Sequence, residues 1–431
     1  MAQRASSSGG TAVAEAVWDD LRARIGAERV RNGTPDDEVD GVLPSMVAEP
    51  ADEQEVAATL HWARDAGVAV CPRGGGSKCA WGNQPVRGDL VLSTARLNRV
   101  IEHAWADLTV VVEAGVTVKD LQSTLAKHGQ QVAVDPLWPE RATVGGVLST
   151  NDSGALRLRY GGLRDLIIGV TLALPDGTLA RSGGKVVKNV AGYDLPKLAT
   201  GALGTLGVIT QAAFRLYPMS RHSRSLTYRA SSFADAGRLI LAAQASTMAH
   251  TGLQARFAYD APGVVDIRFE GTGAGIEAQC IAVRQMAAGG AESSAPDDVW
   301  SARETLWRPA SPAMAIAKFS VLPSKIAEAC ETIRATAEKG GLQWRIVVQG
   351  TGLGWIRLES QNHAAVYAAL VALRGAFERE AGSLFVAHHP AAMTPLDAWG
   401  SAGDALDVML RVKQQFDPRG ILNPGRFVGG I

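Results

Sequence analysis

The sequence predicts an α+β protein of more than one domain, and three observations support this prediction. The chain has 431 residues, which at about 150 residues per domain corresponds to two or three domains. Apolar residues make up 46% of the chain, enough for sizeable cores. Short apolar runs typical of strands alternate with amphipathic helical stretches along most of its length.

In the first half, helices are expected at 11–25, 51–66, 117–128 and 195–200, and strands at 68–71, 89–93, 99–103, 109–114, 166–174 and 207–216. Gly67 ends the second helix, and the strand at 68–71 runs directly into a glycine-rich loop. Residues 175–177, Pro-Asp-Gly, predict a tight turn. The first ten residues form a polar tail, and 32–43 is expected to be a loop.

After Pro218 the glycine-rich motifs stop and the pattern changes. Two successive runs of helices and strands between 225 and 385 predict an antiparallel, ferredoxin-like α+β domain. Its helices are expected at 232–247, 274–288, 323–337 and 361–378, and its strands at 252–259, 263–270, 315–322, 342–349 and 354–359. A last helix at 406–415 leads into a rigid Pro- and Gly-containing turn at 416–427.

The charge balance excludes a nucleic-acid footprint, because 43 basic residues face 43 acidic ones. The N-terminus shows no apolar stretch of the kind that a signal peptide needs, and apolar runs such as 166–174 are too short to span a bilayer. We therefore expect a cytoplasmic protein. Four widely spaced cysteines predict reduced, mostly buried thiols and no iron–sulfur cluster.

The first glycine-rich loop is Arg73-Gly74-Gly75-Gly76-Ser77-Lys78. Consecutive glycines allow the positive φ angles of an anion-binding nest, and Arg73 or Lys78 could add positive charge. The spacing fits neither a nucleotide-triphosphate P-loop nor a dinucleotide-binding Rossmann fingerprint. On this stretch alone, a plain surface loop explains the residues equally well.

A second motif runs from Thr143 through Gly145 and Gly146 to Asn151 and Gly154. The paired glycines predict a strand end lying flat against a ligand, with Ser149, Thr150 and Asn151 offering polar groups; a turn followed by a capped helix is the alternative. Further along, glycines at 201, 204 and 207 precede Val208 and Ile209, whose backbone is expected to face a purine.

In this order, the motifs at 72–77, 143–154, 159–165, 175–177, 188–195 and 204–210 resemble the FAD-binding domain of the vanillyl-alcohol-oxidase/PCMH flavoprotein superfamily. Within it, the chain is similar to the E subunits of bacterial glycolate oxidase. The resemblance implies two α/β subdomains around an extended FAD, a cap over the flavin ring, and a chain end that returns to the FAD domain. It thus implies an N-terminal tail and helix at 1–44, an FAD domain at 45–218, a cap at 219–405 and a returning segment at 406–431.

The resemblance also implies roles at matched positions. Residues 73–78 hold the diphosphate, and Val208 and Ile209 approach the adenine. Asn423 faces the flavin from the returning segment. The ribityl and flavin side is lined by Thr143, Gly145, Gly146, Ser149, Asn151 and Gly154. Many covalent members carry a histidine where Ser77 stands, so FAD is expected to be noncovalent unless Cys79 forms the link.

The catalytic residues are left open by the sequence. Metal-dependent relatives carry histidine and aspartate on a cap strand whose counterpart here, 348–355, has neither, so no metal is predicted. His388 and His389 are candidates for one general base, since neighbours on a strand point to opposite faces. The candidates for binding a substrate carboxylate are Arg303, Arg308, Arg345 and Arg357, although a solvated or structural role suits each of them better.

The resulting hypothesis is the FAD-binding subunit of a glycolate-type 2-hydroxy-acid dehydrogenase. Hydride passes from the substrate C–H to flavin N5 while a base takes the hydroxyl proton. Electrons continue to partners, namely a second flavin subunit and an iron–sulfur subunit, which could also hold the chain at the inner face of the cell membrane. Two alternatives are a self-sufficient FAD-dependent alcohol or hydroxy-acid oxidoreductase and a non-catalytic assembly subunit.

Overall fold

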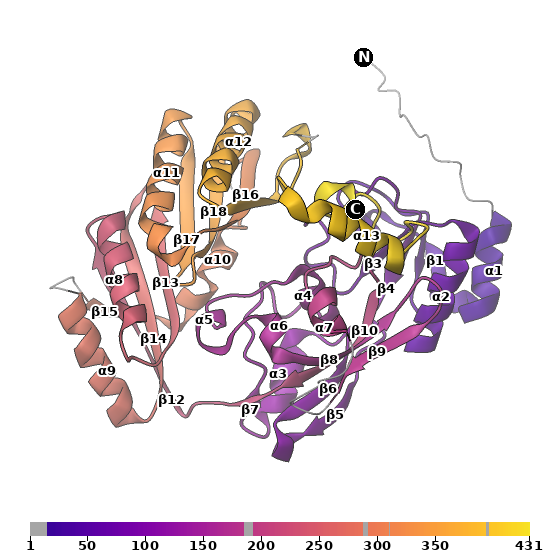
Figure 1. Ribbon diagram of the computed structural model, residues 1–431, viewed down its shortest axis with the longest axis horizontal. Coiled ribbons are helices and arrows are strands. Elements are labelled where there is room, and N and C mark those ends of the chain that lie inside the picture. The colour runs from indigo at the N-terminus through magenta and orange to yellow at the C-terminus, as the bar shows by residue number, and fades with distance from the viewer. Residues whose placement is uncertain (1–14, 185–192, 288–291, 310, 394–395) are drawn as a thin grey trace.

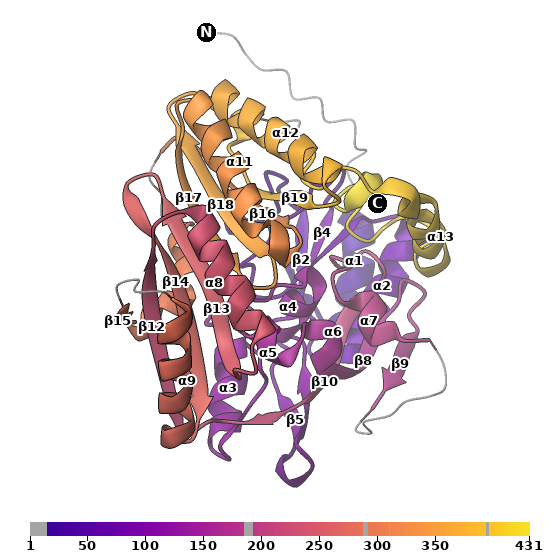
Figure 2. The same ribbon diagram turned by 60° about the vertical axis from the view of Figure 1, so that its left-hand side comes forward.

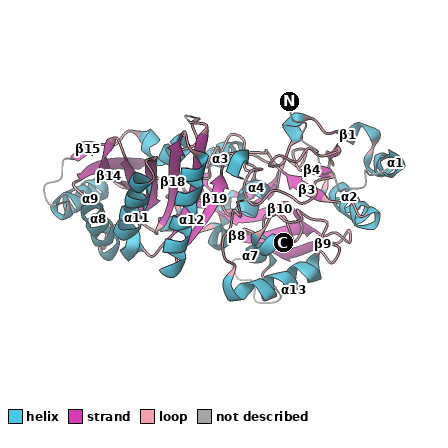
Figure 3. Cartoon of the chain, turned by 90° about the horizontal axis from the view of Figure 1, so that it is seen from above, coloured by secondary structure: helices cyan, strands magenta, loops and turns pink. Residues whose placement is uncertain are grey.

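The computed structural model describes residues 15–184, 193–287, 292–309, 311–393 and 396–431. Two lobes lie side by side, and the C-terminal segment runs from the second lobe back onto the first (Figure 1). Helices and strands are mixed in both lobes (Figure 3). The predicted α+β class is confirmed.

The first lobe begins with a small four-stranded sheet in the order β1-β2-β4-β3. Its strands are β1 Val30–Asn32, β2 Met46–Ala48, β4 Leu90–Ser93 and β3 Val70–Arg73, flanked by helices α1 Glu15–Ile25 and α2 Glu53–Ala66. The Asp52 side chain caps α2 by accepting a hydrogen bond from the Glu55 backbone N–H, and Gly67 ends it at φ +67°. Both β2 and β3 pair in parallel with β4, so the ends of these strands meet at one edge.

A five-stranded antiparallel sheet completes the first lobe, in the order β5-β6-β10-β8-β9. Its strands are β5 Val100–Ala104, β6 Thr109–Glu113, β10 Val208–Arg215, β8 Ile167–Ala173 and β9 Leu179–Gly183, and a separate pair joins β7 Gln130–Gln131 to β11 Tyr217–Pro218. Its helices are α3 Val118–Ala126, α4 Val144–Thr150, α5 Arg157–Tyr160, α6 Leu163–Leu166 and α7 Leu195–Ala199. The predicted turn at 175–177 is present, with Gly177 at φ +85°.

The second lobe, which we call the cap, is one eight-stranded antiparallel sheet in the order β15-β12-β14-β13-β17-β18-β16-β19. Its strands are β12 His222–Ala230, β13 His250–Ala258, β14 Ala261–Gly271, β15 Glu292–Ser294, β16 Ala313–Ser320, β17 Gln343–Gln349, β18 Leu353–Ser360 and β19 Ser383–His388. Helices α8 Phe233–Ala245, α9 Gly273–Met286, α11 Ile326–Lys339 and α12 His363–Arg379 cover one face (Figure 2), and α10 is Ala302–Thr305.

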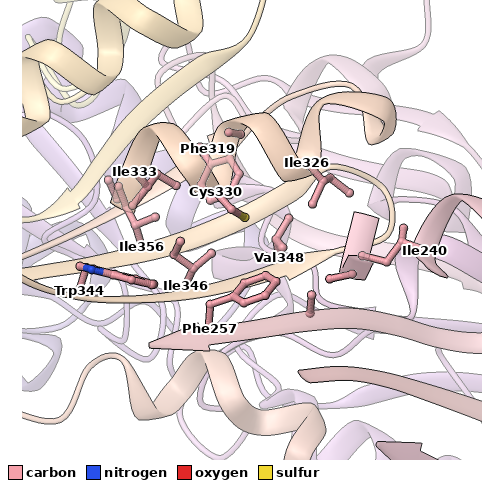
Figure 4. Packing of buried hydrophobic residues seen from close by; sticks show 14 of the residues in the cluster. Ile240, Phe257, Phe319, Ile326, Cys330, Ile333, Trp344, Ile346, Val348 and Ile356 are labelled. Carbon is pink, nitrogen blue, oxygen red and sulfur yellow. The ribbon is translucent and has the colours of Figure 1, made fainter. Parts of the chain in front are cut away.

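The cap contains two ferredoxin-like units rather than the single one predicted. Each unit has the chain order strand, helix, strand, strand, helix, strand, and the two are joined edge to edge through β13 and β17. Apolar residues at alternate positions of β17, such as Ile346 and Val348, pack under α11 against Cys330 and Ile333 (Figure 4).

The C-terminal segment joins the lobes. Helix α13 Leu406–Phe416 is followed by a turn that places Leu422 in a parallel bridge with Val70 of β3. Short 3-10 helices complete the fold at Ala27–Arg29, Pro35–Asp37, Trp105–Asp107, Asp297–Ser301, Pro323–Lys325, Ala391–Met393, Gly403–Ala405 and Val428–Gly430. Among the helices of the described ranges, none is both long and apolar enough to cross a membrane.

Candidate functional site

The glycine-rich loop after β3 packs tightly against the start of α4. A Cβ atom on Gly74 would lie 2.1 Å from Thr143 Oγ1, and one on Gly75 would lie 1.7 Å from the Arg141 carbonyl oxygen. Gly76 has φ +69°. The loop can therefore approach α4 this closely only because these positions carry no side chain.

Residues 143–150 form the helix α4, so the predicted strand end was wrong and the alternative of a capped helix holds. The Thr143 side chain accepts a hydrogen bond from the Gly146 backbone N–H at 3.3 Å and caps the helix. Gly145 fits because its missing Cβ would lie 2.8 Å from the Ala114 side chain. Two glycines lower helix propensity, and the cap together with this close packing compensates for them.

The returning segment forms a third wall. Lys413 Nζ donates hydrogen bonds to the carbonyls of Thr205 and Leu422 and to Asp417 Oδ2, at 2.7–2.9 Å. Asp417 in turn accepts from the backbone N–H groups of Ile421 and Leu422. This buried network fixes the turn that carries Asn423.

Asn423 is 2% exposed and has a left-handed backbone with φ +46°. Its Nδ2 donates to the Leu203 carbonyl at 2.6 Å, while its Oδ1 has no hydrogen-bond partner among the described residues. A buried acceptor without a partner costs free energy unless a ligand supplies the donor.

These three walls enclose a cavity of about 700 Å³, its open mouth included, which we call the cofactor cavity. Thirteen of the fifteen predicted cofactor residues line it: Arg73, Gly74, Gly75, Gly76, Ser77, Lys78, Thr143, Gly145, Gly146, Ser149, Val208, Ile209 and Asn423. Residues 185–192, which hold most of the motif at 188–195, lie outside the described residues.

Asn151 and Gly154 do not line this cavity. Asn151 ends α4 with φ +48° and faces a neighbouring cavity described below. The Gly154 backbone N–H donates to Asp135 Oδ1 at 2.9 Å, and a Cβ there would lie 2.4 Å from Asp135 Oδ2. The close contact with Asp135 therefore explains why position 154 is a glycine.

The two predicted cations of the glycine loop are already paired inside the protein. Arg73 Nη2 donates to Asp37 Oδ1 at 2.7 Å, and hydrogen bonds from Arg31 and Arg73 hold the pKa of Asp37 well below its usual range. Lys78 Nζ donates to the Leu137 carbonyl and lies 3.3 Å from Asp152 Oδ2. Each of these two cations thus already contacts a carboxylate of the protein.

A second cavity, the cap-side cavity, adjoins the first and shares Ser149, Thr150 and Leu203 with it. Its other lining residues are Trp81, Asn151, Arg164, Gly201, Lys318, Phe385 and Trp399. Arg164 donates to the Thr200 carbonyl at 2.8 Å, but no described group accepts a hydrogen bond from Lys318. No carboxylate is found among these described lining residues.

Lys318 lies on β16, and among the described residues its ammonium group has no hydrogen-bond or ion-pair partner. Burial above all, together with the charges of Arg303 and Arg157, lowers the pKa of its ammonium group to about 8, although Asp152 opposes the shift. Its Nζ lies 5.9 Å from the centre of the Trp355 ring. Sequence reasoning missed this residue, although a lone lysine within the apolar run at 313–319 was a usable signal.

Aromatic side chains fill the space behind Lys318, between the cap and the first lobe. Trp81 contacts Trp307, Trp355 and Phe385 at centroid distances of 5.4–6.4 Å, and Phe385 contacts Trp399 at 4.5 Å. A bulky apolar wall of this kind excludes water from the adjoining cavity.

The four catalytic candidates do not line either cavity. Arg303 is 5% exposed and ties α10 to the first lobe through Asp152 and the Ser153 carbonyl. Arg345 lies on the cap surface, paired with Asp260. His388 lies beside Trp307 at the end of β19, and burial lowers its pKa. His389 bonds to the Pro390 carbonyl.

One other arginine among the candidates for binding a substrate carboxylate also has partners in the protein. Arg357 is buried and donates to the carbonyls of Leu306 and Arg308 and to Glu359. Within the described ranges, no group of three or more His, Cys, Asp or Glu side chains is arranged to hold a metal ion.

The cofactor cavity fits an extended dinucleotide. Glycines at 74, 75 and 145 let the loop and α4 pack closely along the cavity, and the buried Asn423 Oδ1 has no donor among the described residues. Ser77 lines the cavity where a histidyl link would need a histidine, which agrees with noncovalent binding.

Two family models match the chain. One, described as FAD binding domain, matches residues 44–183. The other, described as FAD linked oxidases, C-terminal domain, matches residues 220–355 and 400–427. Together they match more than half of the chain, and FAD, the predicted cofactor, is confirmed.

Curated relatives include Glycolate oxidase subunit GlcD of Bacillus subtilis, 34% identical over 43% of this chain and 39% of that protein. D-lactate dehydrogenase of Archaeoglobus fulgidus is 37% identical over 41% of this chain and 39% of that protein. The match thus spans about two fifths of the length of these relatives. The mitochondrial D-lactate dehydrogenase [cytochrome] of Arabidopsis thaliana is 27% identical over 90% of this chain and 74% of that protein.

Two solved structures share the fold. Alkyldihydroxyacetonephosphate synthase superimposes with a TM-score of 0.72 at 18% identity, covering 96% of this chain and 86% of that one. p-Cresol methylhydroxylase with substrate bound superimposes with a TM-score of 0.74 at 17% identity, covering 96% and 97%. The predicted PCMH-type fold is confirmed.

Proposed function

We propose that this chain, which belongs to the FAD-linked oxidoreductases, oxidises a small 2-hydroxy acid at the junction of its two cavities. One observation carries the proposal: the cofactor cavity adjoins a cavity that holds the unpaired ammonium of Lys318 and no described carboxylate. Relatives named as glycolate oxidase and D-lactate dehydrogenase support the same substrate class.

The chain's own residues provide binding, orientation and exclusion of water. Lys318 attracts the substrate carboxylate, because a cation with a free donor in a low-dielectric site forms a strong charge-assisted hydrogen bond. Trp81, Phe385 and Trp399 form the apolar side of the same cavity. When bound, FAD supplies a ring that accepts a hydride from the carbon bearing the hydroxyl.

No described histidine lines the cap-side cavity, so we assign the hydroxyl proton to neither His388 nor His389. Lys318 itself has a pKa of about 8, close enough to neutrality for a fraction of neutral amine to act as a base. Anchoring and proton acceptance need opposite protonation states of this one amine, so the pH dependence of the rate separates them.

We further propose that electrons leave for partner subunits, as in a complex of the glycolate oxidase type. The support is the name of the Bacillus subtilis relative, which is a subunit. Copurification of this chain with iron-containing subunits, together with a rise in turnover when they are present, would test this step separately from substrate oxidation.

The proposed function is tested with the purified flavin-loaded protein and an artificial electron acceptor. Glycolate, D-lactate, L-lactate and D-2-hydroxyglutarate are compared with 1-propanol, which has a hydroxyl but no carboxylate. We expect bleaching of the flavin absorbance and acceptor reduction with one or more hydroxy acids and none with 1-propanol. Equal rates with the plain alcohol would instead support the alternative of an alcohol oxidoreductase.

A further inference from the structure

Among the described residues, three cationic side chains line the cofactor cavity: Arg73, Lys78 and Arg426. A dinucleotide brings a doubly charged diphosphate, which backbone N–H groups and cationic side chains both stabilise. Arg73 is paired with Asp37 and Lys78 with Asp152, and these two carboxylates also contact Arg31 and Arg303.

Arg426 is different, because its hydrogen-bond partners are neutral. Its Nη2 donates to the carbonyls of Cys79 and Trp81, the latter at 2.7 Å, and its Nε donates to the Asn83 carbonyl at 3.3 Å. Among the described residues, no acceptor is found for Nη1, and no carboxylate forms an ion pair with Arg426.

The side chain is nevertheless only 4% exposed. Carbonyl dipoles orient a guanidinium but do not cancel its charge, and an uncompensated buried charge is costly to the folded state. The charge of Arg426 lowers the pKa of Asp40 at longer range, but burial outweighs this effect and raises the pKa of Asp40 above its usual value. The missing partner is therefore an anion that enters the cavity.

The backbone of Arg426 is fixed as firmly as its side chain. Its carbonyl accepts from the Asn83 backbone N–H and from Trp399 Nε1, both at 2.9 Å. It also lies three residues after Asn423, on the same returning turn. The guanidinium is thus held in place beside the cavity before any ligand arrives.

We infer that Arg426, rather than Arg73 or Lys78, supplies the positive charge that holds the diphosphate of FAD. An arginine suits this role because its planar guanidinium pairs well with phosphate oxygens. The inference concerns cofactor binding alone and does not depend on which substrate is oxidised.

The test compares ligands with and without the diphosphate. The full-length apoprotein is titrated with FAD and with riboflavin, by flavin fluorescence and calorimetry, for the wild type, Arg426→Gln and Arg426→Lys. We expect Arg426→Gln to weaken FAD binding at least tenfold and riboflavin binding less than twofold. Arg426→Lys should recover most of the FAD affinity, because it keeps the charge.

Arg419→Gln is the matched control, since Arg419 lies in the same segment, is exposed and donates to the Arg64 carbonyl. It should leave both affinities unchanged. Equal losses for FAD and riboflavin in Arg426→Gln would show that the residue only organises the loop at 79–83, and no loss for either would place the charge elsewhere. If Arg426→Gln does not fold, the same comparison in Arg426→Lys decides: a loss of FAD and riboflavin alike overturns the inference.

Discussion

The two cavities are built in opposite ways. The cofactor cavity owes much of its lining to glycines, at 74–76, 145–146, 204 and 207. The cap-side cavity is made of side chains that come from distant parts of the chain, among them Trp81, Lys318 and Trp399. A backbone site binds a feature common to the whole family, the dinucleotide, whereas a side-chain site can change with the substrate.

The largest expected effect tests whether the cofactor cavity depends on the buried network of Lys413 and Asp417. Lys413→Met leaves Asp417 buried without its cation, which should cost about 3–5 kcal/mol of unfolding free energy. Chemical denaturation of the apoprotein measures this loss. Lys339→Met, an exposed lysine at the end of α11, is the control and should be close to neutral.

The next effect tests the glycines directly. Gly75→Ala places a Cβ against the Arg141 carbonyl, which is backbone and cannot yield cheaply, so FAD affinity should fall by about 3 kcal/mol. Gly273→Ala has open space around its Cβ and should bind FAD normally. Equal FAD affinities in the two variants would contradict the backbone account of the cavity.

The role of the cap-side cavity in substrate binding is tested at Lys318. Lys318→Met keeps much of the shape and removes the charge, so kcat/KM for a hydroxy acid should fall by about 2–3 kcal/mol while FAD binding is unchanged. Lys318→Arg should restore part of the activity. A parallel loss of FAD in Lys318→Met would mean that the two cavities are not separate in function.

The pH dependence sharpens the role of the same residue. With a pKa of about 8, the ammonium form of Lys318 is present below this pH and lost above it. If Lys318 anchors the carboxylate, substrate affinity should weaken about tenfold between pH 7 and 9, in line with the titration of one group. A rate that rises over this interval would instead identify Lys318 as the base.

The smallest effect concerns a residue that belongs to neither cavity. Arg345→Gln removes an exposed ion pair with Asp260, so stability should change by less than about 1 kcal/mol and kcat/KM should stay the same. Steady-state kinetics and a thermal melt check both. A substantial loss of activity would show that the cap surface takes part in catalysis.

The elements that the sequence predicted well are those with a clear local period. The strands of the cap at 315–322 and 342–349 were predicted within two residues, because both hold short apolar runs bounded by polar residues. Strand β12 was missed, since His222 to Ala230 contains mostly polar residues on its open face. Helix α4 was missed because two adjacent glycines argue against a helix unless the tertiary contact with Ala114 is known.

In the candidate site, too, the features that were predicted are those encoded locally in the sequence. Glycine positions of the cofactor cavity were predicted because a backbone conformation is encoded locally. The free or paired state of a cation is not: the partner of Arg73 lies 36 residues away, and Lys78 meets Asp152 only in the folded chain. Lys318 and Arg426 emerged from the structure because their importance lies in the partners that they lack.

The bridge between Val70 and Leu422 has a consequence for biosynthesis. The ribosome makes the glycine loop long before Asn423 and Arg426, so a nascent chain that has not reached these residues cannot complete the pocket. Cofactor loading must therefore follow synthesis of the returning segment, and a product truncated before residue 413 should emerge colourless even when its first lobe is folded.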